Sequence, residues 1–431
     1  MKHAICGVIA ALAVPVLTGP AYADGCGPRP ATQVNQDPNG PLTLDDAVAR
    51  ASRQAPEIML SALEARAASA DADQAGRWLN PSISVETENF AGTGGLEGFD
   101  AYETTLALEQ TFRLGGKRRL SERAARAEAA LASAECALQR LEAQMLAGEL
   151  FLDLQAAIQM ADVAEASAKL AEEFASVVER RVDAGAAAPP ELSRARSEAA
   201  SLKAAADAAR GEAEARALAL ASVWGSAEVD FVLPEPETSG LAIGTAEPDS
   251  APGSHPRLQA AQAGADARAA ATDRARAGAW PDVTVSAGVR RFEDTGDSAF
   301  LAGVSLPLPV FDRNQDATRA ARIRTEGAQL NARAVEARLR AEQASLAAQV
   351  RAAKSRLQRL EGEALPLAED AYASAAEGYR VGKFDLTATL DARRSLIETR
   401  AKVIDARLAL QTQTLRLRAL IGAAPFEGES Q

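Results

Sequence analysis

Histidine, cysteine and aromatic residues are all scarce in this chain of 431 residues, which has two histidines, three cysteines and 4% aromatics. An enzyme that combined a catalytic base with metal ligands would need more histidine than this. The sequence also has no phosphate-binding G-x-x-x-x-G-K-[ST] loop and no H-E-x-x-H metal motif. We therefore expect a protein that is not an enzyme, with no cofactor and no metal site of its own, so that any metal selectivity would reside in a partner.

Large side chains are few, and alanine is abundant. Helices with alanine on their contact faces pack closely side by side, as in a coiled coil, and do not surround a bulky core. Leu120, Ala124 and Ala127 begin a series of apolar positions spaced alternately by four and three residues. This heptad pattern predicts one long helix from Lys117 to about Val182.

Long apolar runs are absent after the first residues, so no membrane helix of about 20 residues is expected in the mature chain. Residues 1–23 combine a positive start, an apolar stretch and the Ala21-Tyr22-Ala23 cleavage pattern, which predicts an export signal. Any membrane span of the exported chain would then consist of strands.

The cysteines predict no disulfide framework, because Cys6 leaves with the signal and Cys136 lies alone in a predicted helix. Cys26 follows Ala23-Asp24-Gly25 and so has the small residue that precedes the cysteine of a lipoprotein signal. It lacks the apolar residue usual three positions upstream. Cys26 is a candidate site of lipidation, with an unmodified cysteine in the tail as the alternative.

The charge balance is acidic, with a net charge of −12. A chain with this sign does not complement a phosphate backbone, which argues against a nucleic-acid partner.

Two pairs of segments alternate between apolar and polar residues, as strands with two unlike faces do. In the segment from Ser82 to Phe90, for example, Ile83 and Val85 fall on one face and Glu86 on the other. Strands of ten to twelve residues cross a bilayer when tilted. Four cannot close a barrel, so we expect them to be shared among subunits, eight in a dimer or twelve in a trimer. Aromatic residues at both strand ends favour the membrane, with a soluble sandwich as the alternative.

The order of elements occurs twice, because Pro56 and Pro256, and Pro81 and Pro281, are each 200 residues apart. The predicted organisation is a signal peptide, an extended tail, a first repeat of helix, two strands and long helical hairpin, a linker, a second repeat of the same elements, and a C-terminal tail. These segments cover residues 1–23, 24–41, 42–225, 226–255, 256–422 and 423–431 in that order.

Several short motifs stand out within this order, and they are TLDDAV (Thr43–Val48), LNPSISVETENF (Leu79–Phe90), FRLGGKRR (Phe112–Arg119), SLPLPVFDRNQ (Ser305–Gln315) and EGYRVGKFDL (Glu377–Leu386). Together with the order of elements they resemble the TolC-like outer-membrane efflux factors, in the heavy-metal branch of CzcC-type cobalt–zinc–cadmium resistance components. The resemblance implies a mainly α fold with a small β part. Long coiled-coil hairpins would form an α-barrel in the periplasm, and four strands per chain would join a twelve-stranded β-barrel in a homotrimer.

The same resemblance implies a place in the outer membrane of a Gram-negative bacterium and a role as the exit channel of a tripartite system. Its partners would be a periplasmic adaptor, or membrane fusion protein, an inner-membrane pump of the RND class, and outer-membrane lipid. The cargo would be heavy-metal cations. Organic compounds or drugs are the alternative cargo, and a periplasmic coiled-coil adaptor or a structural trimer are alternative roles.

The resemblance also implies roles for residues at the two hairpin tips. An acidic constriction of the entrance falls on Asp391, with Ala388 where the family has an earlier acidic position, and Glu191 is the acidic residue after the first tip. Tyr379 matches a tyrosine that ties neighbouring helices together in the closed state. Glu191 and Asp391 could instead be capping or solvated carboxylates. We expect the adaptor to dock on Gly185, Pro189, Pro190, Gly382 and Lys383.

Overall fold

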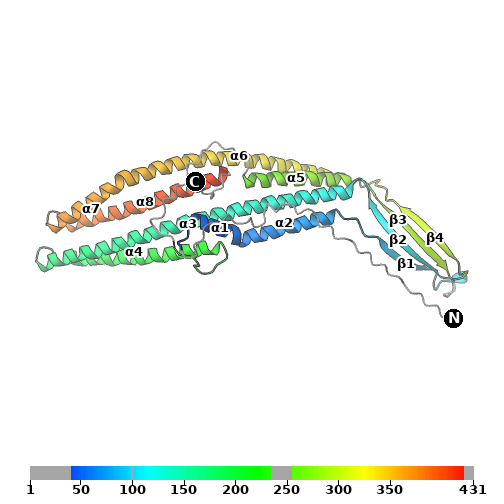
Figure 1. Ribbon diagram of the computed structural model, residues 1–431, viewed down its shortest axis with the longest axis horizontal. Coiled ribbons are helices and arrows are strands. Elements are labelled where there is room, and N and C mark those ends of the chain that lie inside the picture. Colours follow the sequence, from blue (N-terminus) through cyan, green and yellow to red (C-terminus); the bar gives the residue numbers. More distant parts are fainter. Residues whose placement is uncertain (1–39, 99–100, 234–254, 422–431) are drawn as a thin grey trace.

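A long helical body with a small sheet at one end makes up the chain (Figure 1), which we describe from a computed structural model covering residues 40–98, 101–233 and 255–421. This arrangement confirms the expectation of a mainly helical fold with a small β part. The predicted signal peptide, Cys26, most of the tail before Leu42 and the predicted C-terminal tail lie outside the described residues.

Two helices begin the first repeat, α1 (Leu44–Gln54) and α2 (Pro56–Ala75). The Thr43 hydroxyl accepts a hydrogen bond from the Asp46 N–H at 3.1 Å, so it caps α1. The Asp46 carboxylate accepts from the Thr43 hydroxyl. Pro56 begins α2 because its missing N–H costs nothing in a first helical turn.

The first hairpin consists of α3 (Lys117–Asp183) and α4 (Pro189–Ser222). The 67 residues of α3 give a helix about 100 Å long. All other helices of the first repeat, and α5 and α8 of the second, pack against α3. Most of its buried positions are alanines or other small residues, which lets these neighbours lie close.

The second repeat contains α5 (Pro256–Ala277), α6 (Gln315–Arg359), α7 (Leu365–Arg380) and α8 (Leu386–Ile421). A π-helical turn at Leu360–Ala364 joins α6 to α7, just before Pro366 in the first turn of α7. We call α7 and α8 the second hairpin. Among the described residues, none of the helices is apolar enough over a sufficient length to cross a membrane.

Four strands form one antiparallel sheet in the order β1-β2-β3-β4. The central pair, β2 with β3, joins the two repeats. Apolar side chains on one face are open to solvent in the single chain, with Ile83 73%, Phe300 91% and Val304 74% exposed. The strand bounds are Ser82–Glu88, Glu103–Arg113, Asp282–Phe292 and Ser298–Ser305.

Each repeat passes from sheet to long helix through backbone in the left-handed region, at Gly115 and Gly116 in the first repeat and at Asn314 in the second. Gly116, with φ 72°, precedes α3, and Asn314, with φ 56°, precedes α6. Glycine adopts this conformation without strain, and asparagine is among the few other residues that do so readily. The Asn314 amide also donates to the Ala275 carbonyl at 2.5 Å, which fixes α6 against the end of α5.

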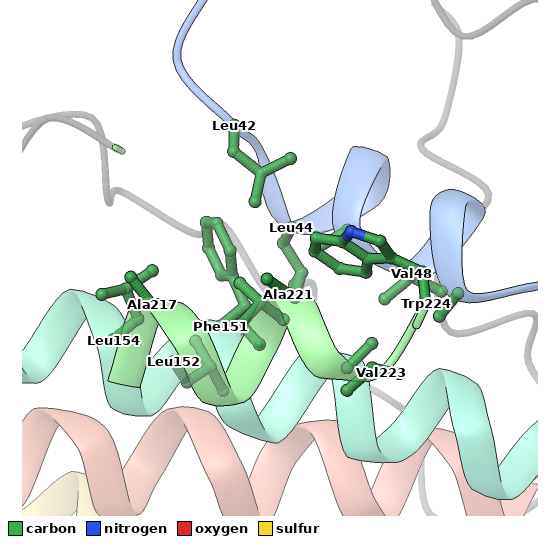
Figure 2. Close-up of a cluster of buried hydrophobic side chains, with 14 of the residues drawn as sticks. Leu42, Leu44, Val48, Phe151, Leu152, Leu154, Ala217, Ala221, Val223 and Trp224 are labelled. Carbon is green, nitrogen blue, oxygen red and sulfur yellow. The ribbon is translucent and has the colours of Figure 1, made fainter. Parts of the chain in front are cut away.

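The largest apolar cluster lies midway along the body, where α1 and the end of α4 pack on α3 (Figure 2). Leu44, Val48 and Trp224 approach Phe151 and Leu152 of α3. Fully burying one such large side chain stabilises a fold by about 1.5–3 kcal/mol. This cluster holds the start of the described chain to the end of the first repeat.

The prediction that the cysteines form no disulfide was wrong. Cys136 of α3 is disulfide-bonded, and its side chain is fully buried. The heptad pattern places Cys136 on a packed face of α3, but a pattern within one helix cannot indicate a covalent partner elsewhere in the chain.

His255 caps α5. Its Nδ1 accepts a hydrogen bond from the Arg257 N–H at 3.0 Å, and 2% of the residue is exposed. Burial, followed by the nearby Arg257 charge, lowers the pKa of His255 from 6.5 to about 4. The capping nitrogen can accept only while the imidazole is neutral.

We expect His255 to make the protein less stable in mild acid. The folded state binds fewer protons than the unfolded state between pH 6.5 and 4, so the free energy of unfolding should fall by about 2 kcal/mol from pH 7 to pH 5. His255→Asn keeps a capping acceptor but does not titrate. The fall in the free energy of unfolding between pH 7 and pH 5 should therefore be smaller in this variant by about the same amount. Thermal unfolding in detergent at both pH values measures it, and an equal fall in the two proteins would contradict the assignment.

Candidate functional site

The two hairpin tips lie together at the end of the body farthest from the sheet (Figure 1). Glycines in the left-handed region turn both tips, Gly185 with φ 69° and Gly382 with φ 78°. Backbone N–H groups after each glycine then bond back to the preceding helix, as from Lys383 to the Gly378 carbonyl at 2.7 Å. Pro189 and Pro190 begin α4 at the first tip.

Tyr379 of the second hairpin is the residue that connects the two tips. Its hydroxyl donates to Glu191 Oε2 of α4 at 3.0 Å. Arg181 of α3 donates to the Tyr379 carbonyl, and its guanidinium carbon lies 4.6 Å from the centre of the Tyr379 ring. Arg181 also donates to the Ala186 carbonyl at 3.2 Å, which joins this contact to the first turn.

Burial keeps the Tyr379 hydroxyl protonated. Only 2% of this residue is exposed. Burial, then the hydrogen bond to Glu191 and the charge of that carboxylate, raise the pKa of Tyr379 to about 12, against the opposing charge of Arg181. Tyr379 therefore remains a hydrogen-bond donor throughout the physiological pH range.

A buried arginine connects the hairpins one step farther from the tips. Arg393 of α8 is 2% exposed, and its guanidinium lies 3.5 Å from a Glu198 carboxylate oxygen on α4 and 5.8 Å from the Phe174 ring centre on α3. Its Nε and Nη2 atoms have no hydrogen-bond partner among the described residues. Burial lowers the pKa of Arg393, although the nearby Glu198 charge opposes this shift.

Apolar packing surrounds these polar contacts. The Phe174 and Tyr379 rings lie 5.3 Å apart, and Val178, Leu386 and Leu390 belong to the same buried cluster. Side chains of both hairpins therefore shield one side of the Tyr379 contact from water, and hydrogen bonds to a charged group are stronger where water is shielded.

The acidic residues at and near the tips differ in their contacts and in their exposure to solvent. Glu191 serves in two ways, since Oε1 also accepts from the Ala188 N–H at 3.3 Å and thereby caps α4. Asp385 caps α8 through the Ala388 N–H at 2.8 Å. Asp391 lies farther along α8 and is exposed.

A cavity of about 390 Å³ separates the two tips. Both cationic and anionic side chains line it, and they include Arg181, Glu191, Arg194, Tyr379 and Asp385. Gly185, Gly382, Lys383 and Asp391 do not line it. The structure thus brings Glu191 and Tyr379 into contact and leaves Asp391 apart from them.

Sequence reasoning missed Arg181 and Arg393. Arg181 lies in the last turn of α3, where a basic residue is common because it complements the helix dipole. That signal would not have identified its contact with Tyr379, which lies 198 positions away. Among the described residues, no group of three or more His, Cys, Asp or Glu side chains is arranged to hold a metal ion.

The chain is similar to known metal-resistance proteins. It is 28% identical to the cobalt-zinc-cadmium resistance protein CzcC of Cupriavidus metallidurans, over 85% of this chain and 86% of that protein. It is 33% identical to the nickel and cobalt resistance protein CnrC of the same organism, over 64% of this chain and 65% of that protein.

Its fold is similar to that of the outer membrane protein VceC from Vibrio cholerae, with a TM-score of 0.72 and 22% identity over 88% of this chain and 96% of that one. The sequence profile of one family, described as outer membrane efflux protein, matches residues 47–226 and 248–423, which covers most of both repeats. The chain belongs to the outer membrane efflux protein family.

Proposed function

We propose that this protein is the outer-membrane channel of a tripartite efflux system that exports heavy-metal cations. The observation that carries the proposal is the family match across both repeats together with similarity to one metal-resistance protein along 85% of the chain. A channel needs a passage and not a catalytic centre. The cation would cross without being chelated, so the choice of metal would be made by the pump and not by this channel.

Three copies would share one barrel. In the described sheet, β1 and β4 are the edge strands, and each has one side without a strand partner. Unpaired edges are not tolerated in hydrocarbon, so β1 of one copy would pair with β4 of the next. The exposed apolar face with Ile83, Val85 and Val304 would then contact lipid.

The polar face of the sheet supports a water-filled interior. Arg290 of β3 forms ion pairs with Glu88 at 2.7 Å and Glu103 at 2.8 Å, across β2 to β1. It also donates to the Thr105 hydroxyl at 2.9 Å. Such a charged network belongs on the lumen side of a barrel, because a lipid-facing position would bury these charges in hydrocarbon.

The hairpin tips would dock the periplasmic adaptor, which in turn contacts the inner-membrane RND pump. Gly185 and Gly382 lack side chains and lie at the extreme turns, so another helical tip could approach the backbone closely. Pro189 and Pro190 stiffen the start of α4, and Lys383 adds a positive charge at the second turn.

The Tyr379 contact would hold the entrance closed. It joins the second hairpin to the first at the end away from the membrane. Opening would require the second hairpin to move from the first and break the bonds of Tyr379 with Glu191 and Arg181. Asp391 would form an acidic ring about the symmetry axis, where three carboxylates favour cations over anions.

Export of metal is tested first in the native bacterium. Deleting the gene should lower tolerance to cobalt, zinc, cadmium or nickel, and the intact gene should restore it. A gene that encodes Gly382→Trp should not restore tolerance, because the tryptophan side chain would block the turn and be strained at positive φ.

The control is Gly211→Trp, which lies in open space on α4 and should restore tolerance. Cross-linking should show three copies for the wild type and for both variants. Loss of tolerance only to organic compounds would refute the metal cargo.

Removing one hydroxyl tests the closed-state contact. Tyr379→Phe keeps the ring packing but deletes a hydrogen bond to a charged group, worth about 1.5–3 kcal/mol. We expect roughly a tenfold to hundredfold rise in the ratio of open to closed channel in planar bilayers. Tyr372→Phe, earlier on the same helix, is the matched control. Equal open probability in wild type and Tyr379→Phe would rule out this role of the bond.

A charge-neutral variant tests the proposed acidic ring. Asp391→Asn should lower cation selectivity and weaken block by divalent ions, because three carboxylate charges leave the entrance. Asp385→Asn removes the same charge from a capping position that asparagine also fills well, so it should change selectivity less. Reversal potentials in a salt gradient measure both, and unchanged values in Asp391→Asn would leave Asp391 a solvated surface residue.

A further inference from the structure

Arg393 of α8 combines nearly complete burial with incomplete bonding. Only 2% of its side chain is exposed, and the carboxylate of Glu198, 3.5 Å away, keeps 28% of its own side chain exposed. The Nε and Nη2 atoms of Arg393 are buried with no hydrogen-bond partner in the part of the chain that the structure describes. Because these atoms are buried within a single chain, a side chain of a neighbouring copy could not reach them. Their burial costs free energy that bonds do not return in full.

Groups of the first hairpin cover Arg393, although Arg393 itself belongs to the second. Glu198 lies on α4, and the ring of Phe174 on α3 has its centre 5.8 Å from the Arg393 guanidinium carbon. The site disfavours the charged form, because burial lowers the pKa of Arg393 by more than the nearby Glu198 charge raises it. Moving the second hairpin away from the first would uncover the guanidinium and return its N–H groups to water.

We propose that Arg393 opposes closure of the entrance, so that Tyr379 and Arg393 act on the gate in opposite directions. The inference rests on the proposed function, because the tips must form the gate, but it does not depend on the cargo. Tyr379 exchanges water for a hydrogen bond to the Glu191 carboxylate at 3.0 Å, which favours the closed state. Arg393 gives up water for a single carboxylate at 3.5 Å, which favours the open state.

Arg400, about two turns farther along α8, forms an ion pair that opening would leave intact. It donates to a Glu369 carboxylate oxygen at 3.0 Å. Glu369 lies in α7, so both partners belong to the second hairpin and would move together. The Arg400 side chain is also 33% exposed, so its charge stays in contact with water. Arg400 therefore provides a matched control for Arg393.

Two single substitutions at this ion pair should shift the gate in opposite directions. Arg393→Met replaces the buried charge with an apolar side chain of similar length, and Glu198 remains partly hydrated without its partner. Removing a buried charge in this way stabilises the state that buries it, so the ratio of open to closed channel should fall about tenfold. Glu198→Gln instead leaves the buried charge without a carboxylate, so the ratio should rise about tenfold.

Single-channel recording of the full-length protein in planar bilayers tests the proposal. Arg393→Met is recorded in the wild type and in the Tyr379→Phe variant, whose larger open fraction makes a fall in the ratio easy to measure. Arg393→Lys keeps a charge at the site, so its ratio should stay above that of Arg393→Met. In the Arg393→Met background, Glu198→Gln should have no further effect, because no buried charge is left to compensate. Arg400→Met should leave the ratio unchanged.

The outcomes separate the role of Arg393 from the gate itself. If Tyr379→Phe opens the channel but Arg393→Met raises the ratio or leaves it unchanged, the role of Arg393 is overturned and the gate stands. If Tyr379→Phe, Arg393→Met and Glu198→Gln all leave the ratio unchanged, the tips are not the gate, and both proposals are overturned. Cross-linking checks the assembly of each variant, and Arg393→Leu is a second neutral variant. Failure of both neutral variants to assemble would also overturn the proposal, because a residue that only opposes closure is not needed for assembly.

Discussion

Close packing through alanine along α3 is the constraint on which the rest of the molecule depends. Ala147, Leu152 and Cys136 of this helix are fully buried. Alanine and other small residues occupy most of its buried positions. A Cβ at Gly148 would lie 2.9 Å from the Leu415 side chain of α8, which indicates how near the second hairpin approaches. A larger side chain at such a position would push the helices apart, because interiors tolerate little added volume.

This packing also explains why the joints between sheet and helix are built from special residues. A helix about 100 Å long transmits any error in its starting direction to its far end. Gly116 and Asn314 set that direction with left-handed backbone, and Trp280 packs against Gly115, where a Cβ would lie 2.4 Å from the ring. The duplicated chain solves the same geometric problem with glycine in one repeat and asparagine in the other.

Local signals made most of the fold predictable. Heptad spacing indicated α3 to within a residue of its end at Asp183, and the alternation of apolar and polar residues indicated the strand that begins at Ser82. The site was harder to predict from the sequence. Tyr379 and Glu191 came from resemblance to a family, while Arg181 and Arg393 act across 195 or more positions and have no local signature. Contacts between hairpins depend on how the repeats pack, which periodicity within one helix does not encode.

The polar contacts at the tips are more buried than those elsewhere along the hairpins. Along α3 and α4 the ion pairs are mostly exposed, as between Arg196 and Glu179, and such pairs contribute little. Arg393 and Tyr379 are buried, so separating the hairpins would expose their polar groups to water. The hydration free energy that these groups regain would offset part of the free energy of the broken contacts. If the tips form the proposed gate, closure and opening would be nearly balanced at this end, while the close alanine contacts would hold the rest of the body together. On the proposed function, a partner that docks at the tips and contacts one of the two states better than the other would then shift the equilibrium toward that state.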